Sequence, residues 1–95
     1  MSAYLITDVE VTDETLYAEF REKMTPAIES YGGTFIERGG EIEIIQGSWT
    51  PTRLAIVEFE SMEKARAWLN SAENHALDDI RTRSSNINMV LVQGV

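Results

Sequence analysis

The stretch that decides the fold runs from residue 31 to residue 59 and reads YGGTFIERGGEIEIIQGSWTPTRLAIVEF. Its glycines separate short segments rich in β-branched and aromatic residues, which is typical of strands joined by turns. We expect strands over Thr34–Arg38 and Arg53–Phe59, with a turn at Gly39–Gly40. Between them, acids alternate with isoleucines over Glu41–Gln46, and this pattern predicts a half-exposed ribbon at the edge of a sheet.

A helical pattern of apolar residues lies on each side of this stretch. Before it, apolar residues recur at steps of three or four between residues 16 and 31, and Pro26 within this stripe predicts a kink rather than an end. After it, a second stripe starts at Met62 and continues past a break near Ser71 to Ile80. We therefore expect one helix before the central stretch and an interrupted helix after it.

The two ends of the chain supply the remaining strands. Residues 3–11 and 88–92 are rich in β-branched and apolar types, which indicates strands. The order is then β-α-β-β-α-β, the ferredoxin-like pattern. A chain of 95 residues has the length of one domain. We expect a single α+β domain over residues 1–95, with a four-stranded antiparallel sheet and its helices on one face.

The predicted strands have apolar residues on both faces. In the strand that ends at Phe59, Leu54 and Ile56 point one way while Ala55 and Val57 point the other way, and the first and last strands have the same character. An antiparallel sheet with one wet face alternates apolar and polar residues instead. The helices can cover only one face, so a second copy packed sheet to sheet is the simplest cover for the other. The pattern predicts a homodimer.

Composition narrows the class of partner. The chain has 16 acidic and 8 basic residues, a net charge of −8, so neither nucleic acid nor a membrane surface is expected as a partner. It has no cysteine, which excludes disulfides, thiolate catalysis and cysteine-ligated metals. No secretory signal or membrane-spanning run is visible, so a cytoplasmic location is expected. No cofactor is predicted.

The joint spacing of these residues resembles the family catalogued as domain of unknown function 1330. The resemblance implies two ferredoxin-like subunits with facing sheets, the dimeric α+β barrel. That superfamily includes cofactor-independent monooxygenases, isomerases, haem-degrading enzymes, chlorite dismutases and ligand binders, so the resemblance implies no single reaction. The residues behind it span nearly the whole chain: Tyr31-Gly32-Gly33, Phe35, Arg38-Gly39-Gly40, Gly47-x-Trp49, Arg53, Val57-Glu58-Phe59, Ala65, Trp68, Asn70-Ser71, Glu73, Ile80-Arg81 and Val90-Leu91-Val92-x-Gly94.

The chain departs from this family pattern at one position. Asn74 stands where the pattern favours an aromatic residue after Ser71-x-Glu73. If that aromatic residue lines a pocket in the family, the resemblance implies a more polar or differently shaped pocket in this protein.

Glu58 is the candidate catalytic residue. It is a carboxylate within the most apolar predicted strand and faces the same way as Leu54 and Ile56. If that face encloses a cavity, desolvation would raise the pKa of Glu58 and suit it to act as a general acid or base. The alternative is a buried acid paired with an arginine for structural reasons.

Three arginines are candidate ligand-binding residues. Arg38, Arg53 and Arg81 are three of only eight basic residues, and all three fit the family pattern. Converging guanidinium groups could hold a small carboxylate through paired hydrogen bonds. The alternative is that each arginine ties down a loop or pairs with a nearby acid.

Further candidates are Trp49, Tyr4, Asp8 and His75. Trp49 could be a pocket wall, a lid or a dimer contact, and we favour dimer contact because its loop lies next to the predicted edge ribbon. Tyr4 and Asp8 share a parity in the first strand and could line one cavity with Glu58 if the strand faces agree. His75, the only histidine, lies in a polar stretch and is expected on a solvated helix face rather than as a haem ligand.

Two functions follow. The first is a homodimeric protein that binds a small organic molecule between sheet and helices without catalysis. The arginines indicate that this molecule is an anion. The alternative is a cofactor-independent enzyme of the monooxygenase or isomerase kind. In that case Glu58 would move a proton, Arg53 and Arg81 would bind the anionic group, and Trp49 or Tyr4 would form the wall.

Overall fold

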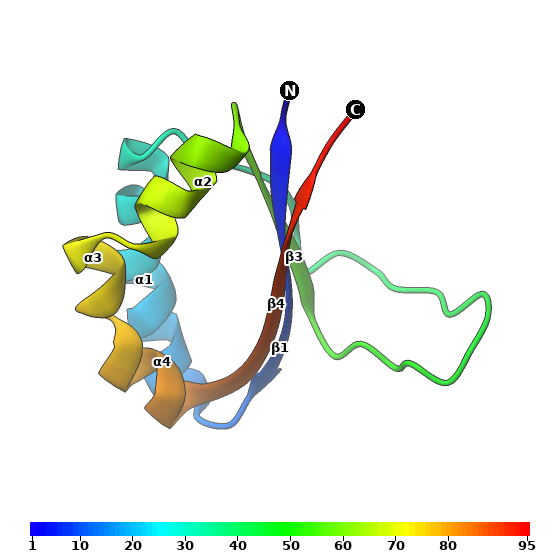
Figure 1. Ribbon diagram of the computed structural model, residues 1–95. Coiled ribbons are helices and arrows are strands. Elements are labelled where there is room, and N and C mark those ends of the chain that lie inside the picture. The colour runs from blue at the N-terminus through cyan, green and yellow to red at the C-terminus, as the bar shows by residue number, and fades with distance from the viewer.

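A computed structural model of the protein describes all 95 residues (Figure 1). Four helices pack on one face of a four-stranded antiparallel sheet with strand order β2-β3-β1-β4. This confirms the predicted ferredoxin-like α+β fold. The elements along the chain are β1 (Ala3–Val11), α1 (Glu14–Ser30), β2 (Thr34–Arg38), β3 (Leu54–Phe59), α2 (Met62–Leu69), α3 (Ala72–His75), α4 (Asp78–Ser84) and β4 (Ser85–Gln93).

Helix α1 begins and ends where its local chemistry requires. The Asp13 carboxylate accepts a hydrogen bond from the backbone N–H of Leu16 at 3.0 Å and so caps the first turn. The helix then continues through Pro26 to Ser30, as predicted. The chain leaves the helix after Ser30 through Tyr31 and Gly32, and the φ of 86° at Gly32 is accessible to glycine at little cost.

Ser71 interrupts the second helical region. Its hydroxyl donates to the Trp68 carbonyl oxygen at 2.7 Å and accepts from the Asn74 backbone N–H at 3.0 Å. The first bond closes the end of α2 and the second caps the start of α3, so one buried serine separates two helices. The predicted break near Ser71 is confirmed.

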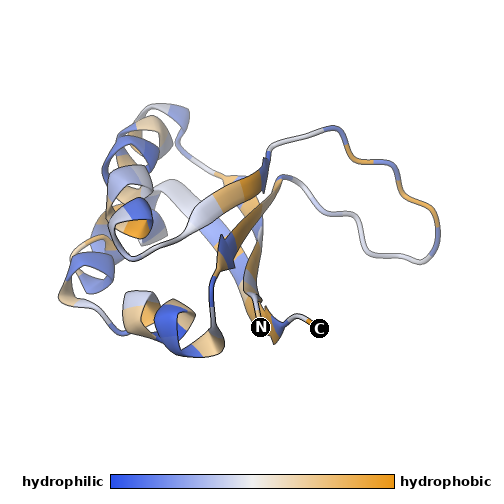
Figure 2. Ribbon diagram, turned by 90° about the horizontal axis from the view of Figure 1, so that it is seen from above, coloured by the Kyte–Doolittle hydropathy of each residue, from blue (hydrophilic) through white to orange (hydrophobic).

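The segment between β2 and β3 differs from the prediction. No edge ribbon forms over Glu41–Gln46, because the β2–β3 ladder ends at the Arg38–Ala55 pair and no strand lies opposite the acid–isoleucine run. Residues 40–52, which we call the arm, instead form an irregular loop that projects from the sheet on the side away from the helices (Figure 1). Seen from above, several apolar residues lie along it (Figure 2).

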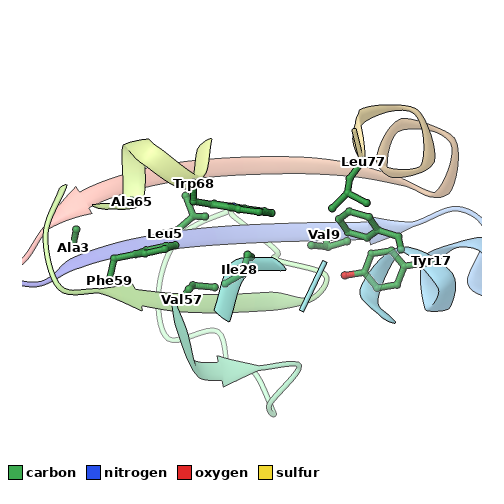
Figure 3. Close-up of a cluster of buried hydrophobic side chains, with 11 residues drawn as sticks. Ala3, Leu5, Val9, Tyr17, Ile28, Val57, Phe59, Ala65, Trp68 and Leu77 are labelled. Carbon is green, nitrogen blue, oxygen red and sulfur yellow. The ribbon is translucent and has the colours of Figure 1, made fainter. Parts of the chain in front are cut away.

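The core lies between the sheet and the helices (Figure 3). Alternate residues of β1, such as Leu5 and Val9, point into it. The register places Tyr4 opposite Glu58 and Ile6 opposite Ile56 on the other face of the sheet, which we call the outer face. This agrees with the predicted two-faced strands. The buried core residues are Ala3, Leu5, Val9, Tyr17, Phe20, Ile28, Val57, Phe59, Ala65, Trp68 and Leu77.

Gly33 is required by close packing where α1 turns into β2. A Cβ added there would lie 2.5 Å from Ile28 Cγ2 and 2.9 Å from Val57 Cγ1, inside contact distance. Gly33→Ala is therefore expected to lower the free energy of unfolding by about 1–3 kcal/mol. Gly40→Ala is the control, since the nearest atom to an added Cβ, at 3.2 Å, is the Oε2 of a single side chain, Glu37, and no core atom is close. Urea denaturation checks both variants, and equal stability would contradict the packing described here.

None of the helices is both long and apolar enough to cross a membrane.

Candidate functional site

A cavity of about 220 Å³ lies between the sheet and the helices. Ligand pockets for drug-sized molecules span roughly 300–1,000 Å³, so this cavity suits a smaller molecule. Most of its wall is apolar. The lining residues are Leu5, Thr7, Val9, Tyr17, Phe20, Arg21, Met24, Ile28, Phe35, Arg38, Gly39, Arg53, Leu54, Ala55, Val57, Trp68, Asn74, Arg81, Ile87 and Met89.

Four arginines from different elements meet at this cavity, namely Arg21, Arg38, Arg53 and Arg81. Three of them lie over aromatic rings. The guanidinium carbon of Arg38 is 4.0 Å from the centroid of the Phe35 ring, that of Arg53 is 5.6 Å from Tyr17, and that of Arg81 is 5.2 Å from Phe20. Aromatic faces favour a guanidinium group, and the N–H donors at its edge stay available to a ligand.

Three of these arginines have no carboxylate partner. The ion pairs of the chain involve Lys23, Lys64, His75, Arg81 and Arg83. Arg21, Arg38 and Arg53 make none, although the chain has 16 acidic residues. No acid lines the cavity either. The cavity is therefore a positively charged site within a negatively charged protein, and such a site favours an anionic ligand.

Arg38 is held at the end of β2 by a neutral partner. Its Nη2 donates to Thr25 Oγ1 at 2.8 Å. Burial lowers the pKa of Arg38, and the nearby charge of Arg21 lowers it further. A guanidinium stays protonated in proteins despite such a shift. Two uncompensated positive charges close together cost free energy that a bound anion would recover.

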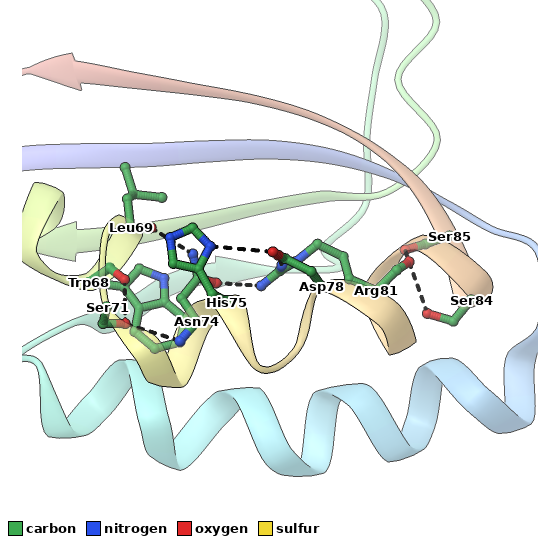
Figure 4. Close-up of polar contacts among 9 residues, drawn as sticks. All are labelled: Trp68, Leu69, Ser71, Asn74, His75, Asp78, Arg81, Ser84 and Ser85. Carbon is green, nitrogen blue, oxygen red and sulfur yellow. Dashed lines mark hydrogen bonds and ion pairs between the residues drawn. The ribbon is translucent and has the colours of Figure 1, made fainter.

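Arg81 is held by two side-chain partners, Asp78 and Asn74 (Figure 4). It donates to Asp78 at 2.6 Å and to the Asn74 side-chain oxygen, and Asn74 in turn donates to the Leu69 carbonyl oxygen at 3.0 Å. Burial lowers the pKa of Arg81, while the pairing with Asp78 opposes this. Arg81 is thus a fixed part of the cavity wall, and some of its N–H donors are already bonded within the protein. Asn74, the position that departs from the family pattern, lines the same cavity.

The predicted site residues fall into two groups on opposite faces of the sheet. Arg38, Arg53 and Arg81 are brought together at the cavity. Tyr4 and Glu58 are paired neighbours on the outer face, and Asp8 shares that face. The strand faces therefore agree, as one shared cavity would require, but Tyr4, Asp8 and Glu58 do not line the sheet–helix cavity. Glu58 and the arginines do not form one site.

Trp49 and His75 also lie outside the cavity. Trp49 is exposed on the arm, where its Nε1 donates to Asp8 Oδ2 at 3.3 Å. His75 is exposed on α3, with Nδ1 3.3 Å from Asp78 Oδ2. The solvated position expected for His75 is the one found.

Sequence reasoning missed Arg21 and Tyr17. The predicted apolar stripe starts with Leu16 pointing inward, whereas the structure buries Tyr17 and leaves Leu16 partly exposed. Tyr17 and Arg21 are four residues apart, so they lie on one side of α1 and reach the same cavity. This spacing of four residues is the feature of the sequence from which both could have been predicted.

Comparison with known families identifies the chain. The sequence pattern of the family described as Domain of unknown function (DUF1330) matches residues 2–95. The chain belongs to this family. The match spans nearly all of the DUF1330 chain, in agreement with the diffuse resemblance noted in the sequence. A comparison with curated proteins found no match.

Solved structures share the fold of this DUF1330 protein at low sequence identity. A protein of unknown function from Rhodopseudomonas palustris, RPA0582, superposes with a TM-score of 0.78 at 13% identity, over 99% of this chain and 82% of that one. SnoaB, described as a cofactor-independent oxygenase from Streptomyces nogalater, gives 0.72 at 8% identity, over 99% and 93%. A protein from Jannaschia sp. CCS1, described as dimeric and ferredoxin-like and of unknown function, gives 0.68 at 14% identity, over 99% and 100%.

Proposed function

We propose that this DUF1330 protein binds a small organic anion in the sheet–helix cavity and does so as a homodimer. The observation behind this is the set of arginines without acidic partners at an otherwise apolar cavity. The homodimer is supported by the two-faced strands, and a structural neighbour is described as dimeric.

The lining suggests how such a ligand would lie. Arg38 and Arg53 would receive the charged group, because hydrogen bonds between a guanidinium and a carboxylate are short and strong. Trp68 and Leu5, both buried, would contact an apolar or aromatic body. We therefore expect a ligand with one charged end and a flat apolar remainder.

A matched pair of probes tests this proposal. 2-Naphthoate and 2-naphthamide have the same ring system and nearly the same shape, and only the first is anionic at neutral pH. Isothermal titration calorimetry is expected to show naphthoate binding at least about ten-fold tighter, the effect of one charge-assisted hydrogen bond. Equal affinity for the two probes would contradict an anion site.

Catalysis is the second candidate. A fold neighbour is described as a cofactor-independent oxygenase, and a cluster of arginines can stabilise an anion formed during a reaction. However, the cavity is lined by neither a carboxylate nor a histidine, and Glu58 lies on the opposite face. An acid or base for proton transfer would have to come from the ligand or from Tyr17, whose ring reaches the cavity. Binding of an anion is therefore better supported than an enzymatic reaction.

Glu58→Gln tests whether Glu58 takes part in the site at all. Because Glu58 points away from the cavity, the variant is expected to bind 2-naphthoate within about two-fold of the wild type, as surface changes away from a site do. Calorimetry measures the affinity, and circular dichroism checks the fold. A loss as large as that of an arginine variant would restore Glu58 to the site.

A further inference from the structure

The arm exposes large apolar side chains that nothing in the chain covers. Ile45 is 82% exposed, Trp49 63% and Ile44 51%. No residue of the arm belongs to the core cluster or packs against it. An exposed apolar segment of this kind usually marks an interaction site.

The outer face of the sheet is also apolar and lies on the same side as the arm (Figure 1). Ile6 and Ile56 pair across β1 and β3, and Val90 and Val92 of β4 are 59% and 46% exposed. Because arm and outer face point the same way, a two-fold axis in front of the sheet would place each arm against the other subunit. The same pair of patches would then serve both partners, which a symmetric interface requires.

The surface area supports an uncovered interface of useful size. The chain exposes 6109 Å², whereas a folded monomer of 10.7 kDa is expected to expose roughly 5,500 Å². The excess of about 600 Å² approaches the roughly 800 Å² that each partner buries in a standard stable interface. A second copy of the chain is therefore a sufficient cover.

Asp8 fastens the returning end of the arm. Its Oδ1 accepts from the backbone N–H of Thr52 at 2.9 Å and of Arg53 at 3.4 Å, and its Oδ2 accepts from the Trp49 indole at 3.3 Å. Asp8, which lies on the outer face, is thus bonded to two residues of the arm and to Arg53 directly after it.

Arg53 connects the Asp8 contacts with the arm to the cavity. Its backbone N–H is held by Asp8 and its carbonyl oxygen accepts from the Val9 N–H at 2.8 Å, while its guanidinium lies over Tyr17 inside the cavity. Gly39, next to the other end of the arm, lines the cavity as well. The two residues that flank the arm, Gly39 and Arg53, are therefore part of the cavity wall.

We propose that the arm packs against the outer face of a second copy of this chain, a contact we call the clasp. We further propose that Asp8 and Arg53 couple this contact to the cavity. The clasp depends only on the arm and the outer face, whereas the coupling rests on the proposed anion binding. Binding free energies are reciprocal, so an anion at Arg53 tightens the dimer by the same factor as the dimer tightens the anion.

Arm variants test the clasp. Replacing Ile44 and Ile45 together by serine is expected to raise the dimer dissociation constant about 30-fold or more, as loss of central interface residues does. Replacing both by valine is the matched control and retains the dimer. Sedimentation equilibrium measures the constants. A serine variant that dimerises like the wild type, or a wild type that is monomeric, would overturn the clasp, as would tight binding of the arm only by a different protein.

Asp8→Ala and Arg53→Gln test the coupling. Asp8→Ala is expected to weaken both the dimer and 2-naphthoate binding about ten-fold, while Arg53→Gln weakens naphthoate binding and leaves the dimer constant without naphthoate unchanged. Unaltered naphthoate affinity in Asp8→Ala would overturn the coupling. If the wild type binds no naphthoate while the serine variant still dissociates, the proposed function fails and the clasp stands.

Discussion

Replacing Arg38 and Arg53 together by glutamine is expected to weaken 2-naphthoate binding about 100-fold or more. Each side chain would supply a charge-assisted hydrogen bond worth roughly 1.5–3 kcal/mol, and every 1.4 kcal/mol changes affinity about ten-fold. Neither arginine pairs with an acid, and no acid lines the cavity, so no other ion pair would preserve the site after the substitution. Isothermal titration calorimetry with naphthoate and naphthamide measures the loss.

Arg66→Gln is the matched control for the arginine variants. Arg66 lies exposed on α2 and does not line the cavity, so the change in net charge per substitution is the same while the site stays intact. We expect naphthoate affinity within about two-fold of the wild type. A comparable loss in Arg66→Gln would mean that the overall charge of the protein, and not the cavity, determines binding.

Trp68→Ala is expected to lower the free energy of unfolding by about 3–5 kcal/mol. Trp68 is 2% exposed, lies with its ring centroid 5.7 Å from that of Tyr31, and joins α2 to the sheet. Domains are stable by only about 5–15 kcal/mol, so this one change removes a large share of the total. Urea denaturation followed by far-ultraviolet circular dichroism measures it, at one fixed protein concentration because dimerisation adds to stability.

Trp68→Phe is the control for this prediction. Phenylalanine keeps an aromatic ring in the core and should lose clearly less stability than alanine. If both variants unfold at the same urea concentration as the wild type, the core described between sheet and helices is not the one that stabilises the protein.

The order of elements and the pairing of strands could be predicted from residue periodicity. Period-two patterns identified β1 and β3 and gave Tyr4 and Asp8 one parity, and the register shows that Glu58 shares their face. The same periodicity does not reveal which face a cavity adjoins, because both faces are apolar. That is why Glu58 was expected beside Arg53 and lies instead on the other side of the sheet.

Two local errors have physical causes. Alternation over Glu41–Gln46 suggested an edge ribbon, but a strand needs a partner, and the β2–β3 ladder ends before this segment. On α1, the predicted apolar stripe holds from Phe20 to Tyr31, but at its start Tyr17 and not Leu16 enters the core, and Arg21, one turn after Tyr17, was missed with it. Successive residues of a helix are about 100° apart, so Tyr17 and Arg21 lie beside the predicted stripe and only the width of the buried face brings them to the cavity.

The central claim is that arginines without acidic partners hold an organic anion between sheet and helices. Nitrogen-15 correlation spectra of the arginine side chains during a 2-naphthoate titration test it most directly. The account predicts that the Nε–H signals of Arg38 and Arg53 shift in proportion to occupancy while those of Arg66 and Arg83 stay in place. Shifts at the exposed arginines alone, or none at Arg38 and Arg53 at saturation, would contradict it.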